Sequence, residues 1–391
     1  MWIDRRSFLK HAVVAGGSVL ALPRLGWTQG AAKEPGARTL VLLHLNGGND
    51  GLNTVVPYKD SLYPVLRQAL ALNTGQIRKI DENLGLHPAL SGFEDLWKKE
   101  RLAIINGVGY PNPNYSHFRA TEIWFTAQPA NTPVDGWVGR VLDARPSKAP
   151  LRAVSLTKEK PLSLQCSSPG VATLTDFKQF QVPAGMERAV ELYGRYRELG
   201  GERGRVGRAG SDAIRVAKKI AALQPYQAPL YGRLGQDLRK VLALLNSDID
   251  LEVIQLSFGG FDTHANQAGT HNGLLAQVGN NLRNYQNVLD QRGLGDRVTT
   301  LVFSEFGRRA AENLSGGTDH GSAGPVFLLG KGVRPGLHGS YPALDDLERG
   351  NFKYTTDFRS VYAAVARDFL NLDPDAVKKV AGDHEPLELF A

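Results

Sequence analysis

The clearest signal for the fold of this chain is one stretch near its N-terminal end, Arg38-Thr39-Leu40-Val41-Leu42-Leu43-His44-Leu45-Asn46-Gly47-Gly48-Asn49-Asp50-Gly51. Its first half is a short apolar run rich in residues that favour strands, and its second half is a glycine-rich turn with polar side chains. A short apolar run that ends at glycines is typical of a strand buried on both faces of a sheet. We therefore predict a central strand over 38–45, followed by a loop.

Similar apolar runs recur along the chain, with helical periodicity between them. The further predicted strands are 102–105, 251–256, 298–303 and 325–330, and the predicted helices are 88–99, 116–126, 186–198, 211–223, 231–246, 271–291 and 358–370. Strands that alternate with helices indicate an α/β fold, with a central, mostly parallel sheet and helices on both faces. The basic, glycine-rich segment 200–210 interrupts this pattern and is predicted to be a solvated connector or a lid.

The composition excludes several classes of protein. The chain has 391 residues, of which 42% are hydrophobic and 22% charged, so it is not disordered. No run approaches the roughly 20 apolar residues of a spanning helix. The single cysteine, Cys166, excludes an internal disulfide and a multi-cysteine metal site. A formal net charge of +7 is too mild to indicate nucleic acid, and we expect no nucleic-acid partner.

The N-terminus has the pattern of a targeting segment. Asp4-Arg5-Arg6-Ser7-Phe8-Leu9-Lys10 matches a twin-arginine signal, a mild apolar run follows over 12–22, and small residues suited to cleavage lie at 28–32. We therefore expect a signal peptide over 1–32 and a single domain over 33–391 with insertions at about 140–250. The expected partner during export is the twin-arginine translocase. The expected location is periplasmic or otherwise exported, without a stable membrane anchor.

Polar side chains follow four of the predicted strands. Ligands of open α/β sheets bind beyond the carboxyl ends of the strands, so these positions are the candidates for a site. They are Asp50, Ser116, His117, Asp262, His264, Glu305, Asp319 and His320. Carboxylate oxygens together with imidazole nitrogens suit Zn, Mn or Fe, so we expect one or two divalent metal ions.

Each candidate also has a purely structural interpretation. Asp50 could cap a helix or shape a turn, and Ser116 fits a helix N-cap. Glu305 could pair with Arg308 or Arg309. Outside the candidate set, His44 is expected to be a core histidine, and His271 is expected at a surface or helix-start position.

Ser116 is the candidate nucleophile. A hydroxyl at a helix N-terminus lies where the helix dipole and free N–H groups favour an anion, and a nearby metal would lower the hydroxyl pKa. His117 follows it directly and is the second candidate catalytic residue. Hydrolysis of a phosphate, sulfate or phosphonate ester is the simplest chemistry for such a set.

The combined motifs resemble the bacterial family called domain of unknown function 1501, whose members carry twin-arginine signals. The resemblance runs from about Thr39 to the C-terminus. It rests on the segments 45–58, Leu86-His87-Pro88, Ser116-His117-Phe118, Asp135-Gly136-Trp137, 261–267, Ser304-Glu305-Phe306-Gly307-Arg308 and Gly317-Thr318-Asp319-His320-Gly321. The family is similar to the alkaline phosphatase and sulfatase superfamily. That similarity implies an alkaline-phosphatase-like fold with a two-metal hydrolase site.

The resemblance implies roles for individual residues. Asp50 matches a metal-binding aspartate after the first strand, and Ser116 matches the nucleophile. Asp262 and His264 match a later metal-binding pair, although one residue separates them where the superfamily commonly has three. For the last ligands two alignments remain open. In the first alignment, Asp319 and His320 form the pair and His338 is the final histidine. In the second alignment, Glu305 holds the strand-end metal position and His320 is the final histidine. A composite in which Glu305 and His320 both contribute is preferred.

These observations predict an exported, metal-dependent hydrolase of phosphate esters in preference to sulfate esters. No Cys/Ser-x-Pro-x-Arg context, which sulfatases of the superfamily use, surrounds Ser116 or Cys166. The substrate is expected to be an anionic small molecule or polymer. The alternative is a non-catalytic binding or assembly protein of the cell envelope that retains the fold. No Gly-x-Gly-x-x-Gly motif follows a predicted strand, which argues against a nicotinamide or flavin site.

Overall fold

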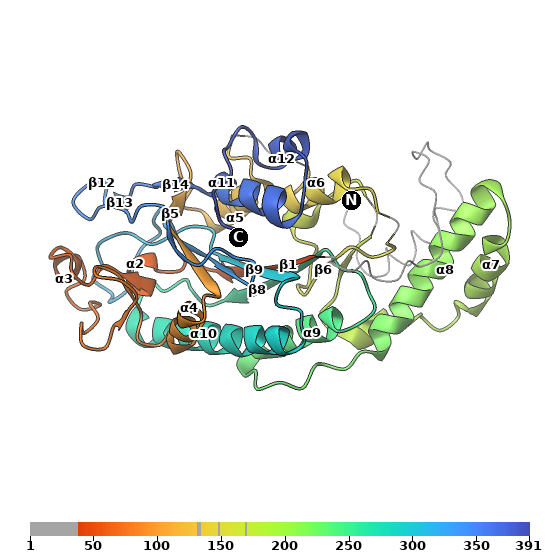
Figure 1. Cartoon of the computed structure of the whole chain (residues 1–391), viewed down its shortest axis with the longest axis horizontal. Helices are drawn as coiled ribbons and strands as arrows, with labels where there is room; N and C mark the ends of the chain where they lie inside the picture. The colour runs from red at the N-terminus through yellow and green to blue at the C-terminus, as the bar shows by residue number, and fades with distance from the viewer. Residues whose placement is uncertain (1–37, 131–133, 148, 169) are drawn as a thin grey trace.

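The computed structural model describes residues 38–391 apart from 131–133, 148 and 169. The predicted signal peptide over 1–32 and its cleavage site therefore lie outside the described residues. The described chain forms an α/β structure built on one nine-stranded sheet (Figure 1).

The central sheet is mostly parallel, as predicted. In spatial order its strands are β7 (Val171–Thr173), β6 (Ala153–Ser155), β8 (Val253–Gly259), β1 (Thr39–Asn46), β9 (Val298–Phe303), β10 (Gly324–Leu329), β5 (Leu102–Gly109) and β11 (Gly336–His338), and β14 (Thr356–Asp357) also pairs with β5. β10 is the exception, because it runs antiparallel to both β9 and β5. The chain from β9 to β10 contains no helix, and a parallel return needs a crossover connection.

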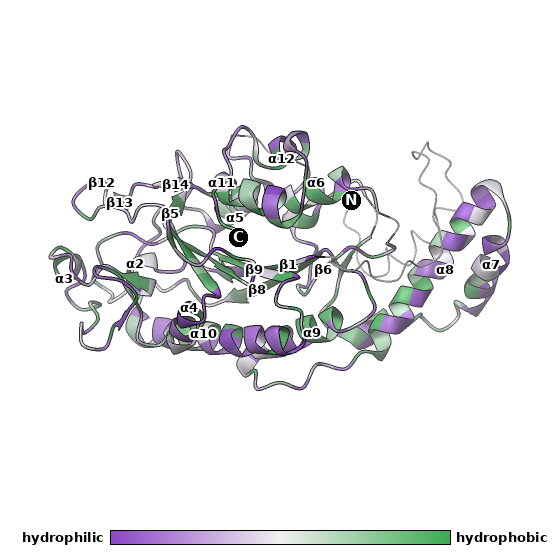
Figure 2. Ribbon diagram, viewed as in Figure 1, coloured by the Kyte–Doolittle hydropathy of each residue, from purple (hydrophilic) through white to green (hydrophobic). Residues whose placement is uncertain are grey.

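Helices cover both faces of this sheet (Figure 1). One face carries α4 (Ser91–Lys98), α9 (Gly232–Leu245) and α10 (Gln267–Gln291), and the other carries α5 (His117–Thr126), α6 (Trp137–Ala144), α11 (Phe358–Ala364) and α12 (Pro374–Ala381). β1 contributes side chains to the hydrophobic cores on both faces of the sheet, because alternate side chains of a strand point to opposite faces. Val41 and Leu43 pack into the first core, and Leu40 and Leu42 pack into the second. Figure 2 shows the apolar colour of these strands.

Shorter elements complete the molecule. They are α2 (Gly51–Thr54), α3 (Tyr63–Leu66), the small sheet of β2 (Val55–Val56), β3 (Arg78–Lys79) and β4 (Gly85–Leu86), the pair β12 (Leu347–Glu348) and β13 (Asn351–Phe352), and the turns η1 (Leu162–Leu164), η2 (Phe177–Phe180) and η3 (Val365–Phe369). No helix in the described part of the chain is both long and apolar enough to cross a membrane.

The prediction of a connector over 200–210 is wrong. This segment begins α8 (Gly201–Ala222), which pairs with α7 (Glu187–Arg197) as a helical hairpin. Its glycines form a close packing surface: a Cβ on Gly207 would lie 2.3 Å from the backbone nitrogen of Arg197, and one on Gly210 would lie 2.4 Å from the ring of Tyr193. The weak helix propensity of glycine is outweighed by this close approach of the two helices.

The carboxyl ends of β1, β8, β9 and β5 lie at the same edge of the sheet. β8 and β9 run parallel to β1, and β5 has the same direction because both β5 and β9 are antiparallel to β10. The loops after these four strands can therefore meet, as expected for the ligand-binding edge of an α/β sheet.

Candidate metal centre

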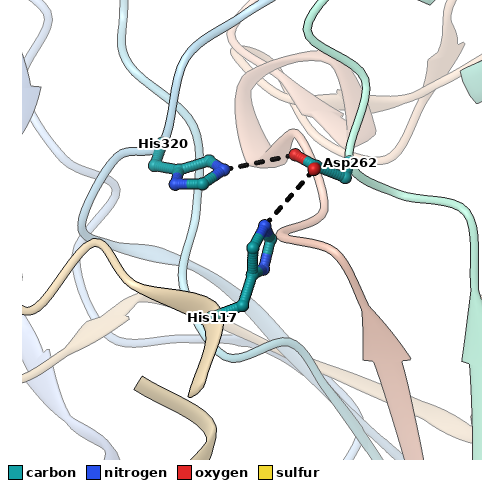
Figure 3. A group of neighbouring side chains, drawn as sticks. All are labelled: His117, Asp262 and His320. Atoms are coloured by element: carbon teal, nitrogen blue, oxygen red, sulfur yellow. Dashed lines mark hydrogen bonds and ion pairs between the residues drawn. The ribbon is translucent and has the colours of Figure 1, made fainter. Parts of the chain in front are cut away.

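Three predicted site residues meet at this edge of the sheet. His117, Asp262 and His320 each offer one ligand atom, and these atoms lie within 4.8 Å of one another (Figure 3). His117 is the first residue of α5, Asp262 lies just after β8, and His320 lies in the loop between β9 and β10. The side chain of Asp262 is 47% exposed, so the group is open to solvent on one side.

The ring of His117 is held by a buried carboxylate. Its Nδ1 lies 2.8 Å from Oε1 of Glu305. An ionised carboxylate only accepts hydrogen bonds, so Nδ1 carries the proton and the lone pair of the neutral ring is on Nε2. That Nε2 atom is buried, makes no hydrogen bond, and lies 3.4 Å from Oδ2 of Asp262. Nε2 of His117 is therefore a buried nitrogen that has a free lone pair, makes no hydrogen bond and faces a carboxylate.

His320 and His264 are oriented in the same way. Nδ1 of His320 lies 2.7 Å from the carbonyl oxygen of Tyr115, and Nδ1 of His264 lies 3.1 Å from Oδ1 of Asp319. Both oxygens only accept, so both rings carry their proton on Nδ1. The two Nε2 atoms, 2.9 Å apart, lie 3.2 Å (His320) and 3.1 Å (His264) from Oδ1 of Asp262.

This arrangement places lone pairs against lone pairs. When all three rings are neutral, three imidazole nitrogens without protons converge on one carboxylate, and two of the nitrogens face each other at hydrogen-bond distance. Such a set is stable only if a cation, either a proton or a metal ion, lies among the nitrogens and oxygens. An imidazole whose other N–H is bonded to a carboxylate or carbonyl is the usual form of a metal-ligating histidine. The donor set therefore fits a divalent metal ion.

Glu305 lies behind His117, inside the protein. Its side chain is fully buried, and it accepts hydrogen bonds from His44 Nε2 at 3.0 Å and from the Gly47 amide at 2.9 Å, besides the bond from His117. Burial raises the pKa of this carboxyl, but the hydrogen bonds from His117 and His44 outweigh it, so the pKa lies well below its usual range. The hydrogen bond that Glu305 accepts from His117 also raises the pKa of His117.

Arg308 joins the loops that carry the site. Its buried guanidinium donates to the carbonyls of Gly47, Gly48, Phe261 and Thr318 and to Oδ1 of Asp262, the last at 2.8 Å. Partial burial raises the pKa of Asp262, but the hydrogen bond and the positive charge of Arg308 outweigh burial and bring the pKa to about 2. Asp262 is therefore an ionised carboxylate at neutral pH.

The approach of the first loop to Asp262 requires glycine. Gly47 has φ +121°, and a Cβ there would lie 2.4 Å from the backbone nitrogen of Asp262. Beside it, the ring of Phe306 packs against the rings of His117 and His320, with centroids 4.9 Å and 4.6 Å apart. The two histidines thus lie on a rigid apolar base.

Asp50 is separated from this group by its own partners. It is 1% exposed, and its two oxygens receive Nη1 and Nη2 of Arg67 at 2.5 Å and 2.8 Å. Gln267 Nε2 adds a third bond at 2.5 Å. Burial raises the pKa of Asp50, but the charge and hydrogen bonds of Arg67 outweigh it and bring the pKa to about 2. The guanidinium of Arg67 therefore lies against Asp50, where the sequence predicted a metal ion.

The remaining predicted residues lie at different distances from the centre of the group. Ser116 is the exposed N-cap of α5, makes no side-chain cap hydrogen bond, and stands between Tyr115 and His117, both of which contact the group. Asp319 is connected to the group through its hydrogen bond with His264. His338 lies in β11, where its Nε2 bonds the carbonyl of Arg334, and among the described residues it has no hydrogen bond or ion pair with the group.

Glu305 was among the predicted site residues, but sequence reasoning missed the contacts through which it builds the site. Glu305 does not pair with Arg308 or Arg309, but with His44 and His117. His44 is a core histidine as expected, stacked on Phe303, but its Nε2 also reaches the site. The prediction of a surface or helix-start position for His271 is wrong, because this residue is buried inside α10 and bonds Asn49. Burial lowers the pKa of His271 to about 4.

Comparison with protein families matches residues 97–383 to "Protein of unknown function (DUF1501)", and the chain belongs to this family. No protein with a curated description matches it.

Three solved structures illustrate the fold-level likeness. The C-terminal periplasmic domain of EcEptC from Escherichia coli is 10% identical, with TM-score 0.43 and coverage of 90% of this chain and 88% of that chain. Phosphonate monoester hydrolase of Agrobacterium radiobacter is 11% identical, with TM-score 0.42 and coverage of 90% and 78%. A protein of the alkaline phosphatase superfamily from Vibrio parahaemolyticus is 11% identical, with TM-score 0.34 and coverage of 86% and 71%. All three TM-scores are below 0.5, so the chemistry of the site rests on its own residues.

Proposed function

Starting from this family membership, we propose that the chain is a metal-dependent hydrolase of phosphate esters. The observation that carries the proposal is the convergence of three imidazole Nε2 atoms on Asp262 within an open, solvent-facing group. Catalytic metal sites keep a position open for substrate, whereas structural sites are closed by protein ligands. The half-exposed carboxylate of Asp262 is consistent with such an open position.

The ligands of the metal would be His117, Asp262 and His320, which leaves a coordination position open, and His264 lies beside them. Imidazole nitrogens with a carboxylate oxygen suit Zn, Mn or Fe. Asp50 would not take part, because Arg67 and Gln267 occupy both of its oxygens. We therefore propose one ion in each chain. A bound divalent cation supplies charge that stabilises the phosphoryl oxygens and lowers the pKa of a nearby hydroxyl.

Ser116 would be the nucleophile. Its Oγ attacks phosphorus while the ester oxygen leaves with a proton as an alcohol, and water then hydrolyses the phosphoseryl ester. Free N–H groups in the first turn of the ten-residue helix α5 would bind phosphoryl oxygens. Glu305, the Tyr115 carbonyl and Asp319 would act as positioning groups, because each accepts the Nδ1 proton of one histidine and fixes its ring.

The test combines metal analysis with one substitution. Mature protein exported with its own signal should contain about one transition-metal ion per chain and hydrolyse an aryl phosphate. Ser116→Ala should keep the metal and lose turnover by at least about 100-fold. Ser211→Ala in α8 is the matched control and should leave turnover unchanged. A folded protein without metal and without turnover would favour the non-catalytic envelope protein instead, and unchanged turnover in Ser116→Ala would remove Ser116 from the mechanism.

Export is part of the same proposal and is supported by the twin-arginine pattern. Replacing Arg5 and Arg6 by Lys should leave the precursor in the cytoplasm, which cell fractionation with an antibody to the mature chain measures. Equal amounts of processed protein outside the cytoplasm in both strains would refute the twin-arginine route.

A further inference from the structure

The hairpin of α7 and α8 projects from the body of the molecule (Figure 1). α7 packs chiefly on α8, and α8 reaches the body through η2 and through apolar residues of its second half, such as Val216 and Ile220. α2, which follows β1 near the candidate metal centre, lies at the opposite end of the view. The hairpin can therefore contact a partner without covering the metal centre.

The hairpin also carries the net charge of the described chain. The segment 187–222 has nine Lys and Arg against five Asp and Glu, a net charge of +4, whereas the rest of 38–391 has 32 of each. The arginines of this segment with ion pairs are Arg197, Arg205 and Arg215. Arg188 and Arg195 are exposed and have no acidic partner among the described residues. Charge concentrated in this way favours an anionic partner.

Two exposed leucines lie among these arginines. Leu192 is 42% exposed and Leu199, just beyond the end of α7, is 44% exposed. Arg188, Leu192 and Arg195 follow the spacing i, i+4 and i+7, which places them on one side of α7, and Leu199 follows just beyond the end of the helix. The buried Tyr193 faces α8 instead. We call these four residues the Arg/Leu stripe. Figure 2 shows the hairpin with hydrophobic colour scattered among hydrophilic residues.

We propose that the Arg/Leu stripe docks the protein reversibly on an anionic lipid surface. Arginines bind lipid phosphates and keep their charged ends in the headgroup layer, while leucine side chains between them enter the acyl boundary. An anionic polymer would use the arginines but has no apolar layer for the leucines. The pairing of both residue types on one exposed face therefore favours the lipid surface.

The experiment is flotation of the full mature chain with vesicles of phosphatidylcholine, alone or mixed with phosphatidylglycerol. We expect binding to the mixed vesicles that weakens as salt is raised. Arg188→Ser with Arg195→Ser should lower partitioning by about fivefold for each arginine. Leu192→Ser with Leu199→Ser should lower it by about tenfold for each leucine. Arg233→Ser and Val65→Ser, exposed residues outside the hairpin, are the matched controls and should bind like the wild type.

A heparin column separates lipid docking from simple polyanion binding. The leucine variant should elute with the wild type from heparin, while the arginine variant elutes at lower salt. Equal binding to both vesicle types, no flotation at all, or unchanged flotation of the leucine variant would each overturn the proposal. Loss of heparin binding in the leucine variant would also overturn it, because the leucines would then act through the fold. None of these measurements uses hydrolysis, so their outcome is independent of the proposed activity.

Discussion

Glu305→Gln tests whether a buried carboxylate prepares His117 for metal binding. In the wild type, Oε1 accepts from His117 Nδ1 and from the Gly47 amide, and Oε2 accepts from His44 Nε2. The glutamine carbonyl can take the place of Oε1 and keep both bonds there. The ring of His117 then remains in position but loses its anionic acceptor, and the amide nitrogen faces His44.

The expected effect is on metal affinity more than on the fold. Charge-assisted hydrogen bonds are roughly twice as strong as neutral ones, and loss of a partner behind a metal-ligating histidine costs about 10- to 100-fold in affinity. That range corresponds to roughly 1.4 to 2.7 kcal/mol of binding free energy. Because the pKa of Glu305 lies well below its usual range, the effect should be the same throughout the neutral pH region.

The assay is a competition titration of metal-free protein against a coloured zinc chelator, with circular dichroism to confirm the fold. Glu252→Gln is the matched control, because Glu252 is a largely buried carboxylate that pairs with Arg152 and has no contact with the described metal group. Affinity of folded Glu305→Gln within about twofold of the wild type would refute the reasoning. So would an equal loss of affinity in Glu252→Gln.

Three further predictions follow from the same contacts. Asp50→Asn should leave the metal content at one ion per chain, because Arg67 already occupies both oxygens of Asp50. Asp262→Asn should lower the metal content at least about tenfold. Elemental analysis measures both, and an equal loss of metal in the two variants would indicate a second ion at Asp50. The pKa of Asp50 is about 2 in the folded protein against 3.8 ordinarily, so roughly 2.5 kcal/mol of stability present above pH 4 is lost as pH falls toward 2. Urea unfolding at stepped pH should show this acid loss in the wild type and a shallower one in Asp50→Asn. Gly207→Leu should detach α7, because even a Cβ there meets the Arg197 backbone. Limited proteolysis should then cut the segment 187–200 while the metal is retained, and an uncut hairpin would contradict the packing argument.

The main strands could be predicted because their residues are apolar in short, bounded runs. β1 is shifted by one residue from the predicted 38–45, and β9 has the predicted bounds 298–303. β6 and β7 were not predicted, since three residues are too few to show a period of two. The beginning of α8 was missed for a different reason. Its glycines favour a loop when read alone, and only the contact with α7 explains why they are helical.

The site was predictable as a set of loops but not as a set of bonds. Parallel strands bring their carboxyl ends together, which is why His117, Asp262 and His320 meet although they are far apart in the sequence. Which group neutralises each carboxylate depends on three-dimensional packing. Arg67 belongs to a segment without a motif of its own, and nothing in the sequence pattern indicates that its guanidinium lies on Asp50.

The two aspartates after β1 and β8 differ in a way that determines what the site can bind. Both carboxylates are paired with a buried arginine, Asp50 with Arg67 and Asp262 with Arg308. Asp50 is sealed by its partners, whereas Asp262 keeps Oδ2 toward His117 and nearly half of its side chain exposed. Because Arg308 already offsets the charge of Asp262, attraction for a cation must come largely from neutral imidazoles. Ions that favour nitrogen ligands, such as Zn or Fe, are therefore expected to bind in preference to Mg or Ca, which depend on oxygen ligands.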